Sequence, residues 1–385
     1  MAHFEGNLIS KLPNTGTTIF TTISALANKH NAINLSQGFP DFSCAPELIE
    51  LVSKHMKLGH NQYSPMAGIM PLREKLAEKI ESLYKAKLNP ETEITITAGA
   101  TQGLSIAISA FIGEDDEVII LEPAYDSYSP CIQLNKGRAI YYTMQAPDFA
   151  INWGNVQKLM NQRTKMIIIN TPHNPTASVL GKKDMEKLQR ILEGTDIILL
   201  SDEVYEHIVF DDNEHQSVLA YPELRKRSIC ISSFGKTYHN TGWKVGYVTA
   251  PENLMTEFRK VFQFGMFSVV TPIQYAFAEI LDKPDLYSEL GAFYQKKRNF
   301  FVDAIKASNF KLLPSNGTYF QCADYSPIAD QSDMEFTRWL TSKIGVAAIP
   351  LSPFYRNKDD NHIIRFCFAK KDETLKKAAD LLCKI

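Results

Sequence analysis

The sequence lacks an apolar run that could cross a membrane, since a helical span needs roughly 20 consecutive apolar residues. It also lacks an excess of charge of one sign, because 41 Lys and Arg residues nearly balance 43 Asp and Glu residues. A formal net charge of −2 gives no field that would attract nucleic acid or anionic lipid. We therefore expect neither a nucleic-acid partner nor a membrane partner.

Cysteine is sparse and forms no Cys-x-x-Cys pair. The six cysteines are Cys44, Cys131, Cys230, Cys322, Cys367 and Cys383. Their spacing predicts neither a metal cage nor a disulfide framework, and it favours free thiols in a reducing compartment. Residues 1–6 also lack the basic-then-apolar layout of a secretory signal. We expect a cytoplasmic protein without a metal site.

The chain has 385 residues, 44% hydrophobic and 22% charged, which is typical of globular proteins large enough for two or more domains. Short β-branched runs alternate with amphipathic stretches. The predicted strands are 94–97, 118–121, 139–143, 166–170, 197–201, 228–232 and 245–249. The predicted helices between them include 101–111, 183–193 and 252–264. This alternation predicts an α/β fold around a mainly parallel sheet of seven strands.

The C-terminal third has a different pattern, with a long helical stretch ahead of short strands. The predicted elements are a helix at 286–308, strands near 318–322, 347–350 and 363–368, and a helix near 373–382. They predict a smaller α+β domain. We expect three parts: a segment 1–45 that joins the small domain, a large ligand-binding domain 46–275, and the small domain 276–385.

Ligands of open α/β sheets gather at the carboxyl ends of the strands, so residues that follow predicted strands are the first candidates. After strand 94–97, small residues around Ala100 and Thr101 open a helix whose free N–H groups could bind a phosphate. The alternative is a plain tight turn. After strand 166–170, two prolines flank Asn174 and could hold its amide toward a ring oxygen. A Pro-rich turn with a local Asn bond is the alternative there.

Asp202 follows the apolar run 197–200. A carboxylate at such a position is costly unless it meets a cation or several hydrogen-bond donors. A protonated pyridine nitrogen is one such cation. The alternative is a helix N-cap, a role that Asp often fills.

Lys236 stands at a strand exit beside hydroxyl-bearing residues. A nucleotide P-loop would need Gly five positions before Gly235, and Cys230 stands there, so that interpretation fails. A buried lysine at this exit suits an imine with an aldehyde. Lys244 with Ser233 could hold a dianionic phosphate. An ordinary surface position is the alternative for either lysine.

Arg365 is embedded in the apolar strand predicted at 363–368. A buried guanidinium needs a partner, and its planar fork favours a carboxylate ligand. An internal Asp or Glu is the alternative partner. None of these features decides the function alone, whereas their order along the chain is informative.

In this order, a small-residue helix turn, an Asn-Pro exit, an Asp-x-x-Tyr exit, a Ser-x-x-Lys turn and a C-terminal Arg resemble the class I aminotransferases. The resemblance covers essentially the whole chain and implies the transferase fold of type I, which uses pyridoxal 5′-phosphate (PLP). Four segments are further similar to bacterial methionine aminotransferases, a group related to kynurenine–oxoglutarate transaminases and cysteine-conjugate β-lyases. They are 35–42, 61–65, 122–128 and 202–207.

The resemblance implies that Lys236 forms the Schiff base with PLP and moves the proton between substrate and cofactor. Asp202 is implied to keep the pyridine nitrogen protonated, so that the ring accepts electrons. Tyr205 and Asn174 are implied to bond the phenolic oxygen, and Tyr125 to stack on the ring. The implied phosphate ligands are Ala100, Thr101, Ser233 and Lys244, with Tyr63 reaching over from the other subunit of a homodimer.

The same resemblance implies that Arg365 binds the substrate carboxylate, together with Asn174 and the Gly38 backbone. The expected partners are amino acid and 2-oxo acid substrates, used in a ping-pong cycle. We find no clear second arginine that would bind a carboxylate on the side chain of the substrate. The expected specificity residues are all apolar: Ile19, Phe20, Phe267, Val270 and Phe354. These residues favour neutral, bulky amino acids such as methionine or aromatic ones.

Two other functions stay open at this point. A cysteine-S-conjugate β-lyase would use the same site, because both reactions pass through the same carbanion. A non-catalytic PLP-binding regulator would usually carry a DNA-binding segment, and residues 1–45 contain no basic helical pair.

Overall fold

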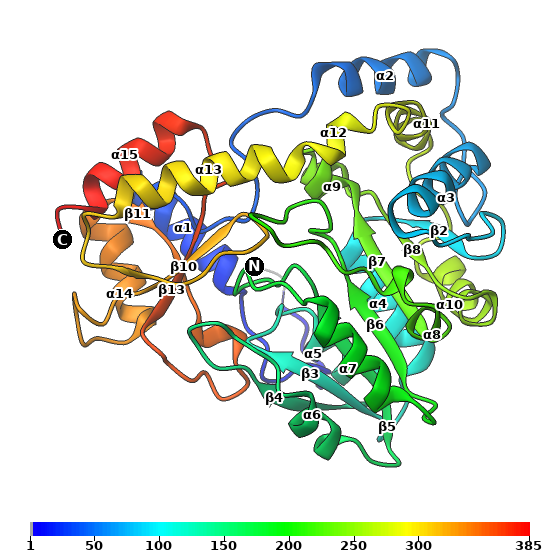
Figure 1. Ribbon diagram of the computed structural model, residues 1–385, viewed down its shortest axis with the longest axis horizontal. Coiled ribbons are helices and arrows are strands. Elements are labelled where there is room, and N and C mark those ends of the chain that lie inside the picture. Colours follow the sequence, from blue (N-terminus) through cyan, green and yellow to red (C-terminus); the bar gives the residue numbers. More distant parts are fainter. Residues whose placement is uncertain (1–2) are drawn as a thin grey trace.

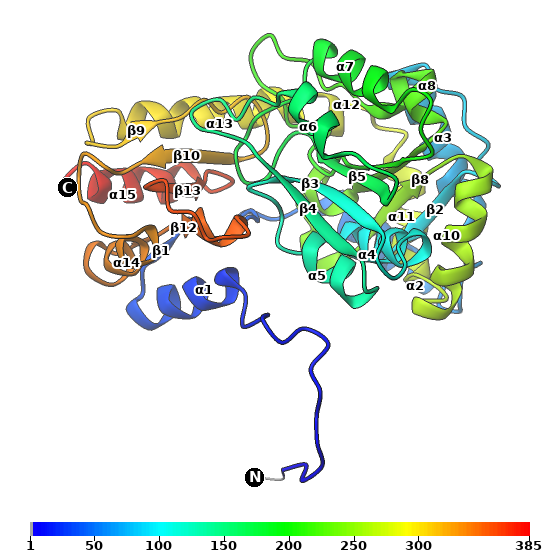
Figure 2. The ribbon, with the colours of Figure 1, turned by 90° about the horizontal axis from the view of Figure 1, so that it is seen from below.

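The computed structural model describes residues 3–385 and contains a larger body around a central sheet and a smaller body that carries the C-terminus (Figure 1). Helix α1 (Ile19–His30) lies against the smaller body. Residues 3–18, ahead of α1, extend away from both bodies (Figure 2). Within residues 3–385, no helix combines the length and the apolar character that a membrane crossing requires.

The larger body is built on a seven-stranded sheet. Its strands, in spatial order, are β2 (Ile94–Thr97), β8 (Gly246–Thr249), β7 (Ser228–Ser233), β6 (Ile198–Asp202), β5 (Thr164–Asn170), β3 (Glu117–Glu122) and β4 (Arg138–Thr143). All pairs are parallel except the two that β8 forms with β2 and β7. The structure thus confirms the mainly parallel α/β sheet, with strand ends within two residues of the predicted ones.

The register of this sheet aligns the strand ends that matter for the site. Asn170 at the end of β5 lies opposite Asp202 at the end of β6, and Asp202 lies opposite Ile231 of β7. The polar residues that follow these three strands therefore meet at one edge. This meeting follows from parallel pairing, which brings the carboxyl ends of successive strands together.

Helices cover both faces of the seven-stranded sheet, which explains why its strands are almost entirely buried, except for the edge strand β4. In Figure 2, α6, α7 and α8 lie above the sheet and α4, α5 and α10 lie below it. The helices of this body are α2 (Pro46–Lys57), α3 (Met70–Tyr84), α4 (Ala100–Phe111), α5 (Tyr128–Leu134), α6 (Trp153–Leu159), α7 (Lys182–Leu192), α8 (Pro222–Arg225), α9 (Phe234–Thr237), α10 (Glu252–Gly265) and α11 (Thr271–Ile280), with 3₁₀ turns η1 (Val218–Ala220) and η2 (Thr241–Trp243).

The smaller body has an antiparallel sheet in the order β12 (Ile349–Pro350), β13 (Ile363–Cys367), β10 (Phe320–Asp324) and β9 (Lys311–Leu312). A separate parallel pair joins β1 (Ile33–Asn34) to β11 (Val346–Ala347). The helices here are α12 (Asp285–Ser288), α13 (Leu290–Ile305), α14 (Asp333–Trp339) and α15 (Asp372–Leu382), with η3 (Leu340–Ile344) and η4 (Ser352–Phe354).

Three predicted elements of this body were wrong in their bounds. The strand predicted at 347–350 is two short strands, β11 and β12, which belong to different sheets. The helix predicted at 286–308 is two helices, α12 and α13, that meet at Glu289. The strand predicted at 318–322 begins only at Phe320, because Thr318 has a left-handed φ of 64°, which no strand residue adopts.

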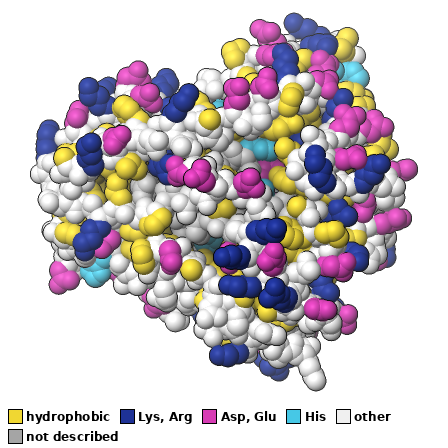
Figure 3. Space-filling view, in the orientation of Figure 1, with side chains coloured by type: hydrophobic (Ala, Val, Ile, Leu, Met, Phe, Trp, Pro, Cys, Tyr) yellow, Lys and Arg dark blue, Asp and Glu magenta, His cyan; other side chains and the backbone are white. Residues whose placement is uncertain are grey.

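The buried apolar residues form two clusters, one on the seven-stranded sheet and one on the small antiparallel sheet. Leu35 belongs to the second cluster, whereas Ile23 of α1 belongs to the first. The division into 1–45, 46–275 and 276–385 stays a prediction, and its second boundary falls inside α11. Lys and Arg are interspersed with Asp and Glu over the face in Figure 3, as the near-zero net charge implies.

Candidate functional site

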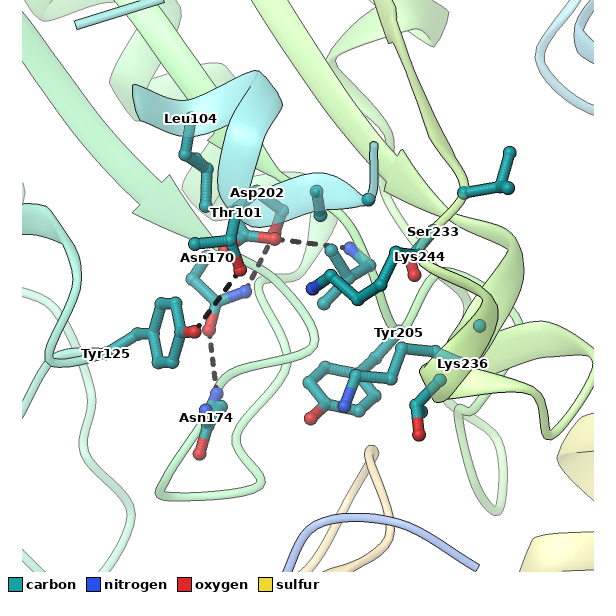
Figure 4. Close-up of a pocket in the computed structure, with 16 residues that line it drawn as sticks. Thr101, Leu104, Tyr125, Asn170, Asn174, Asp202, Tyr205, Ser233, Lys236 and Lys244 are labelled. Carbon is teal, nitrogen blue, oxygen red and sulfur yellow. Dashed lines mark hydrogen bonds between the residues drawn. The ribbon is translucent and has the colours of Figure 1, made fainter. Parts of the chain in front are cut away.

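A cavity lies at the carboxyl ends of β5, β6 and β7, closed on one side by the first turn of α4 (Figure 4). Nine of the residues predicted from the sequence line it. They are Ala100, Thr101, Tyr125, Asn174, Asp202, Tyr205, Ser233, Lys236 and Lys244. The structure therefore brings together in space residues that are spread over almost 150 positions of the chain.

Asp202 is the last residue of β6 and is buried, with 3% of its surface exposed. Its Oδ2 accepts a hydrogen bond from Tyr128 Oη at 2.6 Å, and its Oδ1 a longer one from the Val204 N–H at 3.4 Å. Among residues 3–385 it forms no ion pair with a basic side chain. Burial raises the pKa of Asp202 to about 6, although the Tyr128 bond opposes the shift. The N-cap alternative is wrong, because no helix begins at this residue.

Asn170 and Asn174 fix the loop after β5. Asn170 Nδ2 donates to the Asp202 carbonyl at 2.8 Å, and its Oδ1 accepts the Asn174 N–H at 2.7 Å. The Asn174 side-chain oxygen accepts a bond from Arg365 Nη1. Asn174 therefore links the β5 exit to the smaller body and lines the cavity with a fixed amide (Figure 4).

The first turn of α4 forms a cradle for an anion. Gly99 precedes it with φ +78°, a left-handed conformation that strains residues with a side chain, and a Cβ there would lie in contact with the Lys244 side chain, 3.4 Å from Cε and Nζ. Ser233 and the exposed Lys244 lie on the facing wall. Thr101 Oγ1 is 3.4 Å from Tyr125 Oη. Free helix N–H groups beside an ammonium suit a phosphate.

Lys236 of α9 extends into the cavity and is partly buried. Its Nζ donates to Tyr319 Oη at 2.9 Å and to the Gly38 carbonyl at 3.2 Å. No carboxylate pairs with it in the part of the chain that the structure describes. Desolvation is the main cause that lowers the pKa of Lys236 to about 8, so a neutral amine is accessible near neutral pH.

Arg365 of β13 is fully buried beside the cavity. Besides the bond to Asn174, its Nη2 donates to the Ser36 carbonyl at 3.2 Å, and its Cζ lies 3.8 Å from the centre of the Phe320 ring. Its Nε has no hydrogen-bond partner. The alternative of an internal acid is wrong, since Arg365 forms no ion pair with Asp or Glu within residues 3–385.

The predicted specificity residues fall into two groups. Phe20 and Phe354 meet edge to face with ring centres 5.8 Å apart, and both lie within 6 Å of the Arg365 guanidinium. Ile19 precedes Phe20 in the first turn of α1. Phe267 and Val270 are half exposed and lie with Tyr63 outside the cavity. Tyr63 is 82% exposed, with its ring 5.3 Å from that of Phe267.

Three residues that contact the site were not identified from the sequence. Tyr128 bonds Asp202, Asn170 bonds the Asp202 carbonyl, and Tyr319 bonds Lys236. Asn170 carried a usable signal, since it ends an apolar strand. Tyr319 carried none, because its partner is 83 positions away. Among the described residues, no group of three or more His, Cys, Asp or Glu side chains is arranged to hold a metal ion.

These observations fit PLP. A buried carboxylate without a basic partner suits the cationic ring nitrogen, and the α4 cradle with Lys244 suits the phosphate. Lys236 provides an amine for the aldehyde. Arg365, whose Nε has no partner and which forms no ion pair within residues 3–385, provides a guanidinium for a carboxylate.

Comparisons with known proteins agree with this chemistry. The family "Aminotransferase class I and II" matches residues 30–382. The methionine aminotransferase of Escherichia coli is 49% identical over 97% of each chain. The kynurenine–oxoglutarate transaminase of Dictyostelium discoideum is 33% identical over 96% of this chain and 94% of its own.

Solved structures extend the comparison to the fold. An E. coli structure reported with a methionine aminotransferase function has a TM-score of 0.97 at 48% identity, over 98% of this chain and 100% of that one. An aspartate aminotransferase of Thermus thermophilus has a TM-score of 0.90 at 26% identity, over 98% and 99%. This chain therefore belongs to the class I and II aminotransferases and is a PLP-dependent aminotransferase of fold type I.

Proposed function

We propose that this enzyme transfers the amino group of methionine, or of another neutral and bulky L-amino acid, to a 2-oxo acid. The observation that carries the proposal is the surroundings of Arg365: a buried guanidinium without an internal acid, flanked by the rings of Phe20 and Phe354. The guanidinium suits the carboxylate of an amino acid, and the rings suit an apolar side chain. The similarity to a methionine aminotransferase and to a kynurenine–oxoglutarate transaminase supports the same substrate class.

The bound cofactor supplies an electron sink for the electron pair that remains on the substrate Cα when its proton leaves. Asp202 is assigned to the ring nitrogen, which its buried carboxylate keeps protonated. Tyr205 and Asn174 are assigned to the phenolic oxygen, and Tyr125 to the ring face. The proposed phosphate ligands are the N–H groups of Ala100 and Thr101 and the side chains of Ser233 and Lys244.

Lys236 has two successive tasks in this proposal. Its neutral amine would hold the cofactor covalently. Once a substrate amine has replaced it, the same amine would remove the proton from Cα and deliver it to the cofactor carbon. Arg365 holds the substrate carboxylate, helped by Asn174 and the Gly38 backbone, and so fixes the direction in which Cα–H points. Fixing this direction aligns the breaking bond for transfer.

We assign the exposed side chains of Tyr63, Phe267 and Val270 to a homodimer, in which Tyr63 would reach the phosphate of the other subunit. A mixture of Lys236→Met and Tyr63→Ala chains tests this assignment, because a mixed dimer would contain one site with both residues intact. Regained activity on mixing is expected, and no regain together with monomers in sedimentation would contradict it. We also propose a cytoplasmic location, which the six free thiols support.

The activity itself is tested with a panel of amino acids against several 2-oxo acids. Methionine, leucine and aromatic donors should give parallel-line ping-pong kinetics and one oxo acid per amino group transferred. Aspartate should be a poor donor. A preference for aspartate or glutamate would contradict the proposed substrate class. Formation of pyruvate and ammonia from cysteine conjugates, faster than transfer, would instead indicate a lyase, which the names of the reported relatives do not favour.

A further inference from the structure

The phenol of Tyr319 lies directly beside the catalytic amine. Lys236 Nζ is 2.9 Å from Tyr319 Oη and 3.2 Å from the Gly38 carbonyl oxygen, and Tyr319 Oη donates to that same carbonyl at 2.6 Å. The three polar atoms thus form a closed triangle. Tyr319 itself is completely buried and has no role in the function proposed above.

The number of hydrogens on each group limits what this triangle can do. Tyr319 Oη has one hydrogen, which it donates to Gly38, so it can only accept from Lys236. A neutral amine has two N–H groups and one lone pair. Both N–H groups are used by the two contacts, and the lone pair must therefore point away from Tyr319 and Gly38.

The backbone around Tyr319 is built to hold this position. Thr318, a β-branched residue, adopts φ +64°, a conformation that such residues rarely take and that persists only when the surroundings enforce it. Its N–H donates to the Ile208 carbonyl at 2.9 Å, and the Phe368 N–H donates to the Tyr319 carbonyl at 2.9 Å. The Tyr319 ring packs edge to face against Tyr205, with ring centres 5.2 Å apart.

We propose that Tyr319 is a positioning residue for the proton transfer: with the Gly38 carbonyl it holds the free amine of Lys236 so that its lone pair points at the substrate Cα. The proposal rests on the proposed role of Lys236 as the base. In the step, the lone pair forms an N–H bond while the Cα–H bond breaks. The electron pair of that bond stays with the substrate carbon, and the bound cofactor would supply the sink for it. The ammonium of Lys236 would then give the proton to the cofactor carbon and become a neutral amine again.

The charge on Lys236 also depends on its other neighbours. Asp202 on β6, Arg365 and the Cys367 thiol on β13, and Lys244 after η2 all contribute to its pKa, besides the burial that dominates. These groups are unchanged when Tyr319 becomes Phe. A change in the titration of Lys236 in that variant therefore reports the lost hydroxyl.

The first measurement uses protein freed of PLP. Absorbance follows the rate at which Lys236 reacts with added PLP from about pH 6 to about pH 10, a range that spans the lowered pKa of Lys236 and approaches the ordinary pKa of a lysine. Tyr319→Phe removes an acceptor that stabilises the ammonium. The midpoint of the rate profile should therefore move about one pH unit lower, as expected for a lost bond to a charged group.

The second measurement is a single half-reaction with methionine and with Cα-deuterated methionine. Tyr319→Phe should slow the proton transfer roughly 10- to 100-fold, about the loss of one charged hydrogen bond, and should raise the deuterium isotope effect. A merely structural role would change neither the isotope effect nor the midpoint.

Tyr294→Phe is the matched control. Tyr294 is also completely buried, its ring centre is 5.5 Å from that of Tyr319, and its hydroxyl has no hydrogen-bond partner. This variant should keep the wild-type midpoint and isotope effect, and its melting temperature serves as the reference for folding. If Tyr319→Phe behaves like Tyr294→Phe in both measurements, the proposal is overturned. Failure of the proposed function would look different, since wild-type protein reduced with borohydride after PLP addition would then carry no label on Lys236.

Discussion

Two lysines flank the segment after β6 and differ in how their surroundings treat the charge. Lys79 of α3 is buried, with Nζ 2.9 Å from Glu206 Oε1 and 3.2 Å from Tyr247 Oη. Tyr84 Oη donates to the other oxygen of Glu206 at 2.6 Å. Lys236, in contrast, has only a phenol and a carbonyl as partners. The first lysine is paired within the protein, whereas the second is left for a ligand.

The same contrast occurs along five consecutive residues. Glu203 and Glu206 turn into the protein, where Glu203 accepts bonds from Ser201 Oγ at 2.8 Å and from the Val218 N–H at 2.9 Å. Asp202 and Tyr205 instead line the cavity. The lesson is that satisfied polar groups hold this segment in place, and that those left without a charged partner mark where a ligand binds.

The largest expected effect is that of Lys236→Met, which keeps the aliphatic stem and removes the amine. Transfer from methionine should fall at least roughly 10⁴-fold, because both nucleophile and base are lost. The folded pKa of about 8 lies below the unfolded value of about 10.4. The folded protein thus keeps the full contribution of Lys236 to its stability above about pH 10.4 and loses it as pH falls through about 8. At about pH 7 the cofactor-free variant should therefore melt no lower than the cofactor-free wild type.

Single-turnover assays measure the loss of transfer, and melting curves of the cofactor-free proteins measure the change in stability. Near-normal transfer in the variant would remove Lys236 from the mechanism. A large loss of stability without loss of transfer would make it a structural lysine like Lys79, and the contrast between the two would disappear.

Asp202→Asn should have the next largest effect, a loss of roughly 10²- to 10³-fold in the transfer rate, since the ring nitrogen loses its carboxylate. The folded pKa of Asp202, about 6, lies above its unfolded value of about 3.9. Its contribution to the stability of the cofactor-free protein is thus present below about pH 3.9 and lost as pH rises through about 6. The melting temperature of the wild type should therefore fall as pH rises through about 6, and that of the variant should not. Melting scans at several pH values would measure this difference. An unchanged kcat would contradict the pairing with the ring nitrogen.

The sequence was informative wherever a polar residue interrupted a local apolar pattern. Asp202, Asn174 and Arg365 stand at or in apolar strands, and parallel pairing then required the strand ends to meet. Such signals are local, because burial on both faces fixes the composition of each strand. The seven strands and the candidate residues at their exits could therefore be predicted from the residues alone, whereas the places of Tyr125 and Tyr205 were implied only by the family resemblance.

Contacts between segments that are distant along the chain could not be predicted from the local sequence pattern. Tyr128 meets Asp202 across 74 positions, and Lys79 meets Glu206 across 127. Each side chain is compatible with its own helix or turn, and only the packing of the folded chain selects its partner. The direction of β8, antiparallel to both neighbours, was likewise invisible in its composition.

The smallest expected effect on catalysis is that of Lys79→Met, the matched partner of Lys236→Met. It should leave Glu206 buried without its cation and lower the free energy of unfolding by about 3–5 kcal/mol, while kcat of the folded enzyme changes only a few-fold. Denaturant unfolding and activity per folded molecule measure the two quantities. Adding Glu206→Gln should restore part of the stability, because the uncompensated charge is then removed. If Lys79→Met instead abolished transfer in a stably folded protein, the Lys79 network would belong to the reaction rather than to the scaffold.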